Sequence, residues 1–157
     1  MWNHSKKPSK KHTNEGREKG EGRREKGEGR REKGEGMSDS SFKKLIVWQK
    51  SIDLTEEIYR LTKLLPKDEI YGLINQLRRA AASIPSNIAE GNARKSRKEY
   101  IQFLYISLGS KAEIETQLEL CRRLNYLDDN QISSAVNLCD EIGKILYVLI
   151  KKLSNNT

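Results

Sequence analysis

The chain has 157 residues, of which 35% are hydrophobic and 33% charged, and its formal net charge at pH 7 is +8. The sequence contains no secretory h-region and no apolar run near the ~20 residues that a membrane span needs, so we expect a cytoplasmic protein with no membrane partner. Two cysteines are too few for a disulfide framework. Cys121 and Cys139 both fall in helical apolar patterns, which favours buried, reduced thiols.

Residues 1–36 differ in composition from the rest of the chain. They hold 12 Lys and Arg against 7 Asp and Glu, and only the first two residues are strongly apolar, so we predict a disordered basic tail. A seven-residue unit, Arg17 to Arg23, recurs from residues 24 and 31, but it has no apolar position and two glycines, which excludes a coiled coil. The repeat fits electrostatic RNA binding, a short DNA duplication, or sequence upstream of a native start at Met37.

Residues 37–157 are predicted to form one all-α domain. Apolar residues recur there at three- and four-residue steps, the spacing of one helical face, and no strand pattern occurs. Helices are expected at about residues 47–65, 69–91, 96–124 and 129–154. Because the links are short, neighbouring helices should be antiparallel, which gives an up-down-up-down four-helix bundle.

Local signals place the ends of the first two helices. Pro66 ends the first, because proline has no backbone donor. Asp68 is expected to cap the second helix, whose buried stripe should begin with Ile70. Gly91 is expected to end this helix as a C-terminal glycine.

The third and fourth helices have similar signals. Ser96-x-x-Glu99 is a capping box for the third helix. Asn125 should close that helix, and Asp128 or Asp129 should open the fourth. The middle of the third helix has small side chains that would let another helix approach closely: Ser107, Gly109, Ser110 and Ala112.

The second helix has a proline and polar residues inside an apolar pattern. Pro85 removes one backbone hydrogen bond, so we expect a bend or a loosened turn. Polar residues share one side of this helix, and a similar pair lies on the third: Arg79, Ser83, Asn87 and Glu90, then Glu113 and Gln117. We expect them to bond across helices, to satisfy the backbone that Pro85 frees, and to fix the register of helices or subunits.

No residue set favours catalysis. Residues 37–157 contain no histidine, so the carboxylates lack the Glu-x-x-His partners of a bundle di-metal site, and a nucleophile would lack an imidazole base. We therefore predict no catalytic residue, metal or cofactor.

A set of basic residues is the other candidate site. They would hold the phosphates of RNA or DNA: Arg94, Lys95, Arg97 and Lys98, with Arg78, Arg122 and Arg123 elsewhere. A solvated loop explains the central cluster equally well. Apart from Tyr100, no aromatic residue interleaves that cluster to support base-specific readout.

The run Leu77–Gly91, with Val47-Trp48-Gln49-Lys50 and Gly109-Ser110-x-x-Glu113, resembles the signature of a bacterial four-helix-bundle family associated with 23S rRNA intervening sequences. The match covers about residues 42–153. The resemblance implies a homo-oligomeric ring, commonly a pentamer, without enzymatic activity. It gives these structural signature positions: Arg79, Ser83, Pro85, Asn87, Glu90, Gly91, Gly109, Ser110 and Glu113.

The family is similar to the accessory variability proteins of diversity-generating retroelements, which bind a reverse transcriptase and nucleic acid through a basic surface. The first functional hypothesis is therefore a non-enzymatic, homo-oligomeric accessory protein that binds RNA or DNA. The alternative is a protein-interaction scaffold, a ring that docks a partner such as a reverse transcriptase.

Overall fold

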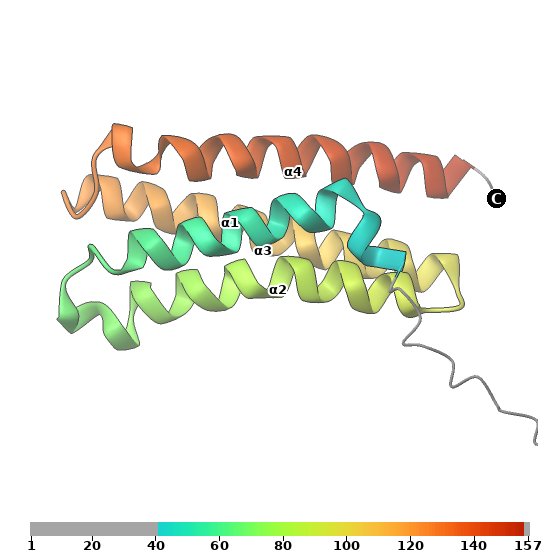
Figure 1. Cartoon of the computed structure of the whole chain (residues 1–157), viewed down its shortest axis with the longest axis horizontal. Coiled ribbons are helices and arrows are strands. Elements are labelled where there is room, and N and C mark those ends of the chain that lie inside the picture. The colour runs from blue at the N-terminus through green and yellow to red at the C-terminus, as the bar shows by residue number, and fades with distance from the viewer. Residues whose placement is uncertain (1–40, 156–157) are drawn as a thin grey trace, which may run out of the picture. The chain divides into compact units, whose positions relative to one another are not determined.

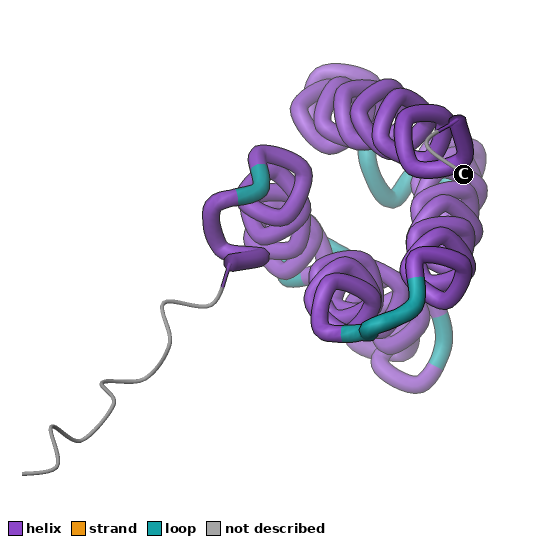
Figure 2. The backbone as a smooth tube through the Cα atoms, turned by 90° about the vertical axis from the view of Figure 1, so that its right-hand side faces the viewer, coloured by secondary structure: helices purple, strands orange, loops and turns teal. Residues whose placement is uncertain are grey.

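Residues 41–155, the part that the computed structural model describes, form a bundle of four helices. They are α1 (Ile46–Thr62), α2 (Leu73–Ala93), α3 (Arg97–Arg123) and α4 (Asp129–Asn155), with two short 3-10 helices, η1 (Ser41–Lys44) and η2 (Lys67–Tyr71). Consecutive helices run in opposite directions (Figure 1) and surround a common centre when seen end-on (Figure 2). The predicted all-α bundle is confirmed, whereas the predicted tail and Met37 lie outside the described residues.

The core takes side chains from all four helices. Its large residues with no more than 2% exposure are Val47, Leu54, Ile58, Leu61, Leu77, Ile84, Ile88, Leu104, Ile114, Leu118, Ile142 and Leu146. Burial of each such side chain contributes about 1.5–3 kcal/mol. Among residues 41–155, no helix is both long enough and apolar enough to cross a bilayer.

Both cysteines are buried and unpaired, as predicted. Burial is the main cause that raises the pKa of Cys121 to about 11 and that of Cys139 to about 12. The thiols are therefore neutral at pH 7, and they pack as small hydrophobic groups.

The second helix begins later than predicted, because residues 67–71 form η2 rather than the first α-helical turn. Glu69 takes the capping role predicted for Asp68, since its Oε2 accepts a hydrogen bond from the Leu73 amide at 3.1 Å. Its Oε1 accepts from the Tyr126 hydroxyl at 3.2 Å and links this turn to the one between α3 and α4. The prediction that Ile70 is buried was wrong: η2 leaves its side chain 55% exposed.

Gly91 does not end the second helix, because α2 continues to Ala93. Its role is close packing against α3. A Cβ atom at Gly91 would lie 2.7 Å from Cβ of Phe103 and 2.8 Å from Cδ2 of Tyr100. Only hydrogen fits at this position without a shift of α3.

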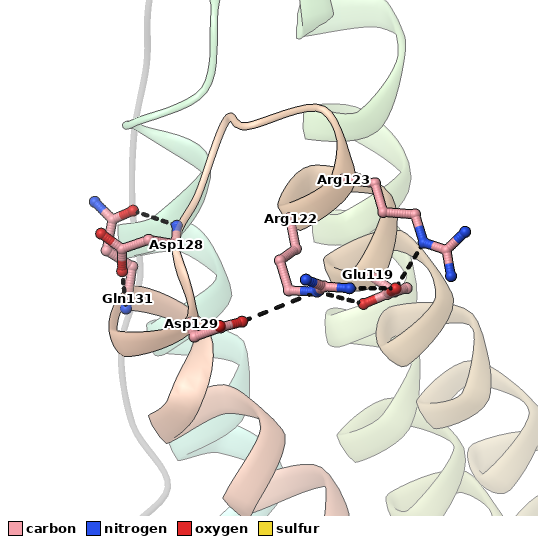
Figure 3. A network of polar contacts seen from close by, with 6 residues as sticks. All are labelled: Glu119, Arg122, Arg123, Asp128, Asp129 and Gln131. Atoms are coloured by element: carbon pink, nitrogen blue, oxygen red, sulfur yellow. Dashed lines mark hydrogen bonds and ion pairs between the residues drawn. The ribbon is translucent and has the colours of Figure 1, made fainter.

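The predicted caps of α3 and α4 are confirmed. Ser96 Oγ accepts from the Glu99 amide at 3.4 Å at the start of α3. Asn125 follows the end of α3 with a positive φ of 57°, a conformation that asparagine tolerates better than most residues. Asp128 and Gln131 each accept from the other's amide at 2.8 Å, so Asp128 is the aspartate that caps α4 (Figure 3).

α2 remains an unbroken helix through Pro85, which is buried. Proline has no amide hydrogen, so the carbonyl of Ala81, four residues earlier, has no helical donor. The Thr55 hydroxyl of α1 lies 3.1 Å from that carbonyl oxygen and 2.7 Å from the carbonyl of Ser51. A side chain of another helix thus reaches the freed carbonyl. The prediction that polar residues of α2 and α3 would satisfy it was wrong, because the donor, Thr55, lies on α1.

Thr55→Val is expected to lower the free energy of unfolding by about 1–2 kcal/mol, because the Ala81 carbonyl loses its donor. Urea unfolding measures this loss. Pro85→Ala is the matched background, since an alanine amide supplies the Ala81 carbonyl with a helical donor. Thr55→Val should lower the free energy of unfolding by less in the Pro85→Ala background than in the wild type. Equal losses in the two backgrounds would contradict the assigned role of Thr55.

Candidate nucleic-acid interface

One end of the bundle gathers basic side chains from three separate parts of the chain. We call this surface the basic end, and all of its members are exposed: Lys43, Lys44, Arg94, Lys95, Arg97, Lys98, Lys151 and Lys152. Figure 1 shows η1, the α2–α3 loop and the end of α4 together on the right, and this end faces the viewer in Figure 2. The fold therefore assembles a basic surface that no single stretch of sequence contains.

Direct contacts hold these segments together. Ser41 Oγ of η1 donates to Asn92 Oδ1 at the end of α2, at 2.8 Å. Arg97, Lys98 and Ile101 of α3 line a pocket of about 380 Å³ with Ser154 of α4. The lysines of η1 and α4 consequently lie at the same end as the loop cluster.

The charge of the folded part is polarised along the bundle. Within the basic end and the adjoining first turns, the acidic residues are Glu90 and Glu99. The rest of residues 41–155 holds 10 Lys and Arg against 12 Asp and Glu. Sequence reasoning missed the lysines of η1 and α4, although the predicted up-down-up-down order places the start of the first helix and the end of the fourth at the same end as this loop.

The aromatic residues beside the basic end are packed rather than free to stack on bases. The guanidinium of Arg94 lies 5.1 Å from the ring centroid of Phe103, and Arg94 also forms an ion pair with Glu90. Tyr100 is partly buried, and burial is the main cause that raises its pKa. This surface is suited to phosphate contacts rather than to base readout.

The other three predicted arginines do not join the basic end. Arg78 is partly buried on α2, where its Nε donates to Thr62 Oγ1 at 2.9 Å and its guanidinium lies 4.8 Å from the ring centroid of Tyr59. Arg122 and Arg123 lie at the far end of α3, which is 27 residues or about 40 Å long. The structure thus brings together four of the seven predicted residues and separates the other three.

Arg122 and Arg123 converge on one carboxylate (Figure 3). Arg122 makes two hydrogen bonds to Glu119, both at 2.8 Å, and Arg123 adds one at 2.7 Å. Arg122, followed by Arg123, holds the pKa of Glu119 at about 2, below its ordinary value of 4.5. These guanidinium groups are therefore engaged within the chain.

Glu119→Gln is expected to remove an acid-sensitive part of the stability. Because the folded-state pKa is lowered, the Glu119 carboxylate contributes fully above about 4.5, and its contribution is lost as the pH falls toward 2. The urea midpoints of the wild type and the variant should therefore converge over that window. A difference that stays constant from pH 7 to pH 2 would contradict the assigned pKa.

Several signature residues line a groove of about 640 Å³ between α2 and α3. Its lining is Gln76, Arg79, Ala80, Ala82, Ser83 and Ser86 of α2 with Glu113 of α3. Ser83 and Ser110 form a hydrogen bond between their hydroxyls across the two helices. Asn87 Nδ2 donates to the Ser83 carbonyl at 2.7 Å, which stays within α2. The predicted cross-helix bonding is thus confirmed for Ser83, whose partner is Ser110.

Comparison with known proteins identifies the family. The sequence model of the family described as 23S rRNA-intervening sequence protein matches residues 43–148. The crystal structure of a protein of unknown function from the S23 ribosomal protein family of Bacteroides thetaiotaomicron VPI-5482 is similar, with 34% identity and a TM-score of 0.63. That similarity covers 68% of this chain and 99% of the other. No curated protein matches. Together with the four-helix bundle, these matches show that the chain belongs to the 23S rRNA-intervening sequence protein family.

Proposed function

We propose that this chain is a non-enzymatic, homo-oligomeric accessory protein of the cytoplasm that binds RNA or DNA through the basic end. The observation that carries the proposal is the concentration of eight exposed Lys and Arg side chains against two acidic ones, Glu90 and Glu99. Lys and Arg side chains that neutralise phosphates displace condensed counterions, which gives affinity without sequence preference. The packed aromatic residues beside this end support backbone binding over base recognition.

The homo-oligomeric part of the proposal rests on α3. This helix has an apolar face in the core, and it exposes a second set of large apolar side chains by 45–55%: Tyr105, Ile106, Leu120 and Leu124. A helix that is apolar on two sides is typical of one with neighbours on both. A ring such as the pentamer that the family resemblance implies would supply the second neighbour. Light scattering of the full chain measures how many copies assemble.

Salt dependence of binding tests the nucleic-acid proposal. With a labelled RNA duplex and a DNA duplex of one mixed sequence, the full chain should bind both. For six or more phosphate contacts, affinity should fall by about 10³ or more between 50 and 200 mM salt. A chain that begins at Met37 should keep most of this dependence if the basic end carries it. Salt-independent binding, or no binding at 50 mM salt, would overturn the proposal.

A second function is favoured by the opposite end of the bundle. Tyr71 is 91% exposed, Ile70 55% and Leu64 50%, all around the α1–α2 turn. Exposed apolar groups of this size mark protein-docking surfaces. In a scaffold that docks a protein such as a reverse transcriptase, Tyr71→Ser should abolish pull-down of the purified enzyme, while charge reversal at the basic end should not. The opposite pattern would count against the scaffold.

A further inference from the structure

The groove between α2 and α3 carries one charge of each sign. Arg79 lines it from α2 and Glu113 from α3, and both residues are exposed. No ion pair within residues 41–155 joins either of them to another side chain. By contrast, Glu57, Glu90 and Glu119 each have an arginine partner within the chain.

A buried glutamine bonded to two residues of this groove has an unsatisfied side-chain oxygen. Gln117 is only 5% exposed, and its Nε2 donates to Gln76 Oε1 at 3.2 Å and to Glu113 Oε1 at 3.1 Å. Its Oε1 is buried and has no hydrogen-bond donor. A buried acceptor without a donor costs about 1–3 kcal/mol, so the polar contacts beside this groove are incomplete in the single chain.

The α3 side of the groove leaves space for another helix. Gly109 and Ala112 are exposed, and a Cβ atom at Gly109 would have no atom within 4 Å. We predicted that another helix packs closely at Gly109, but no helix within residues 41–155 does so. Ile106, one turn earlier, exposes 51% of its side chain beside this space.

We propose that a second copy of this chain packs on the α2–α3 groove, so that Arg79 of one copy pairs with Glu113 of its neighbour. The inference rests on the proposed homo-oligomer and names its contact surface. Each copy carries both charges, so Arg79 on α2 of one copy can meet Glu113 on α3 of its neighbour. A polyanion is a poor occupant, because Glu113 would repel its phosphates.

The pairing requires only that α2 of one copy meets α3 of the next, which a ring satisfies. Both side chains would leave water on contact, and close charge pairs in such interfaces contribute strongly to affinity. Helix approach at Gly109 and Ala112 would bring α2 of one copy within reach of α3 of its neighbour.

Charge reversal in the full chain tests this pairing. Arg79→Glu and Glu113→Arg should each raise the dissociation constant of self-association at least about tenfold, measured by sedimentation equilibrium. The double variant should recover most of the affinity, because the pair re-forms with its signs exchanged. Glu56→Arg and Lys63→Glu, on the exposed side of α1, are the matched controls and should change nothing. Circular dichroism checks that every variant keeps its helix content.

Gly109→Gln tests the same contact surface without changing its charge. At low protein concentration, the helix content and the thermal midpoint of the variant should equal or exceed those of the wild type. The reason is that the new side chain meets open space and glutamine favours helix. The variant should nevertheless weaken self-association at least about tenfold. If the wild type is oligomeric but the single reversals and Gly109→Gln associate normally, this contact surface is wrong while the proposed homo-oligomer stands. A monomeric wild type at micromolar concentration would overturn both.

Discussion

Lys151→Glu combined with Lys152→Glu is expected to weaken nucleic-acid binding by about tenfold or more, although these residues lie far in sequence from the predicted cluster. α4 ends beside Arg97 and Lys98, so both lysines belong to the basic end that we propose as the phosphate-binding surface. Loss of two phosphate contacts should also reduce the slope of log affinity against log salt by about 2. Fluorescence anisotropy with one labelled duplex at several salt concentrations measures both quantities.

Two further double variants serve as controls for the loss of affinity expected in the Lys151 and Lys152 variant. Arg97→Glu with Lys98→Glu removes the same number of positive charges from the basic end and should produce a similar loss. Arg122→Glu with Arg123→Glu changes the net charge equally, but it does so about 40 Å away, where Glu119 already occupies both guanidinium groups. That variant should bind almost normally. Equal losses in all three would mean that binding follows total charge rather than the basic end.

Gly91→Ala and Gly109→Ala are expected to change stability in opposite directions, although each adds one methyl group to a helical glycine. At Gly91 the methyl would lie under 3 Å from Phe103 and Tyr100, so overpacking of about 1–3 kcal/mol should exceed the helix-propensity gain of alanine. At Gly109 there is open space, so only the gain of about 0.5–1 kcal/mol remains.

Urea unfolding at low protein concentration measures both variants against the wild type. The free energy of unfolding should fall by about 1–2 kcal/mol for Gly91→Ala. Tyr100→Ala in the Gly91→Ala background should recover part of the overpacking cost, because it removes the Cδ2 atom that would lie 2.8 Å from the added methyl group. A Gly91→Ala variant that is as stable as Gly109→Ala would contradict the close approach of α2 and α3.

Sequence periodicity was sufficient to predict the four helices, because a helix is a local structure. The three- and four-residue spacing of apolar side chains gave four helices, and the caps at Ser96, Asn125 and Asp128 were visible as short motifs. The errors fell where a distant residue decides the outcome. Glu69, which caps α2 and accepts from Tyr126, replaced Asp68, and Gly91 is needed for packing rather than as a helix stop.

The candidate site also has a part that could be predicted from the sequence and a part that could not. The sequence by itself determined the fold class, the family and the central basic cluster, since each depends on residues close together in the chain. Only the tertiary structure decided that Lys43 and Lys151 join this cluster while Arg78 and Arg122 do not. It also decided that Thr55 satisfies the carbonyl freed by Pro85. Bundle topology brings together residues that are distant in sequence. The predicted up-down-up-down order implies which helix ends meet, but helix periodicity does not show which side chains gather on one surface there.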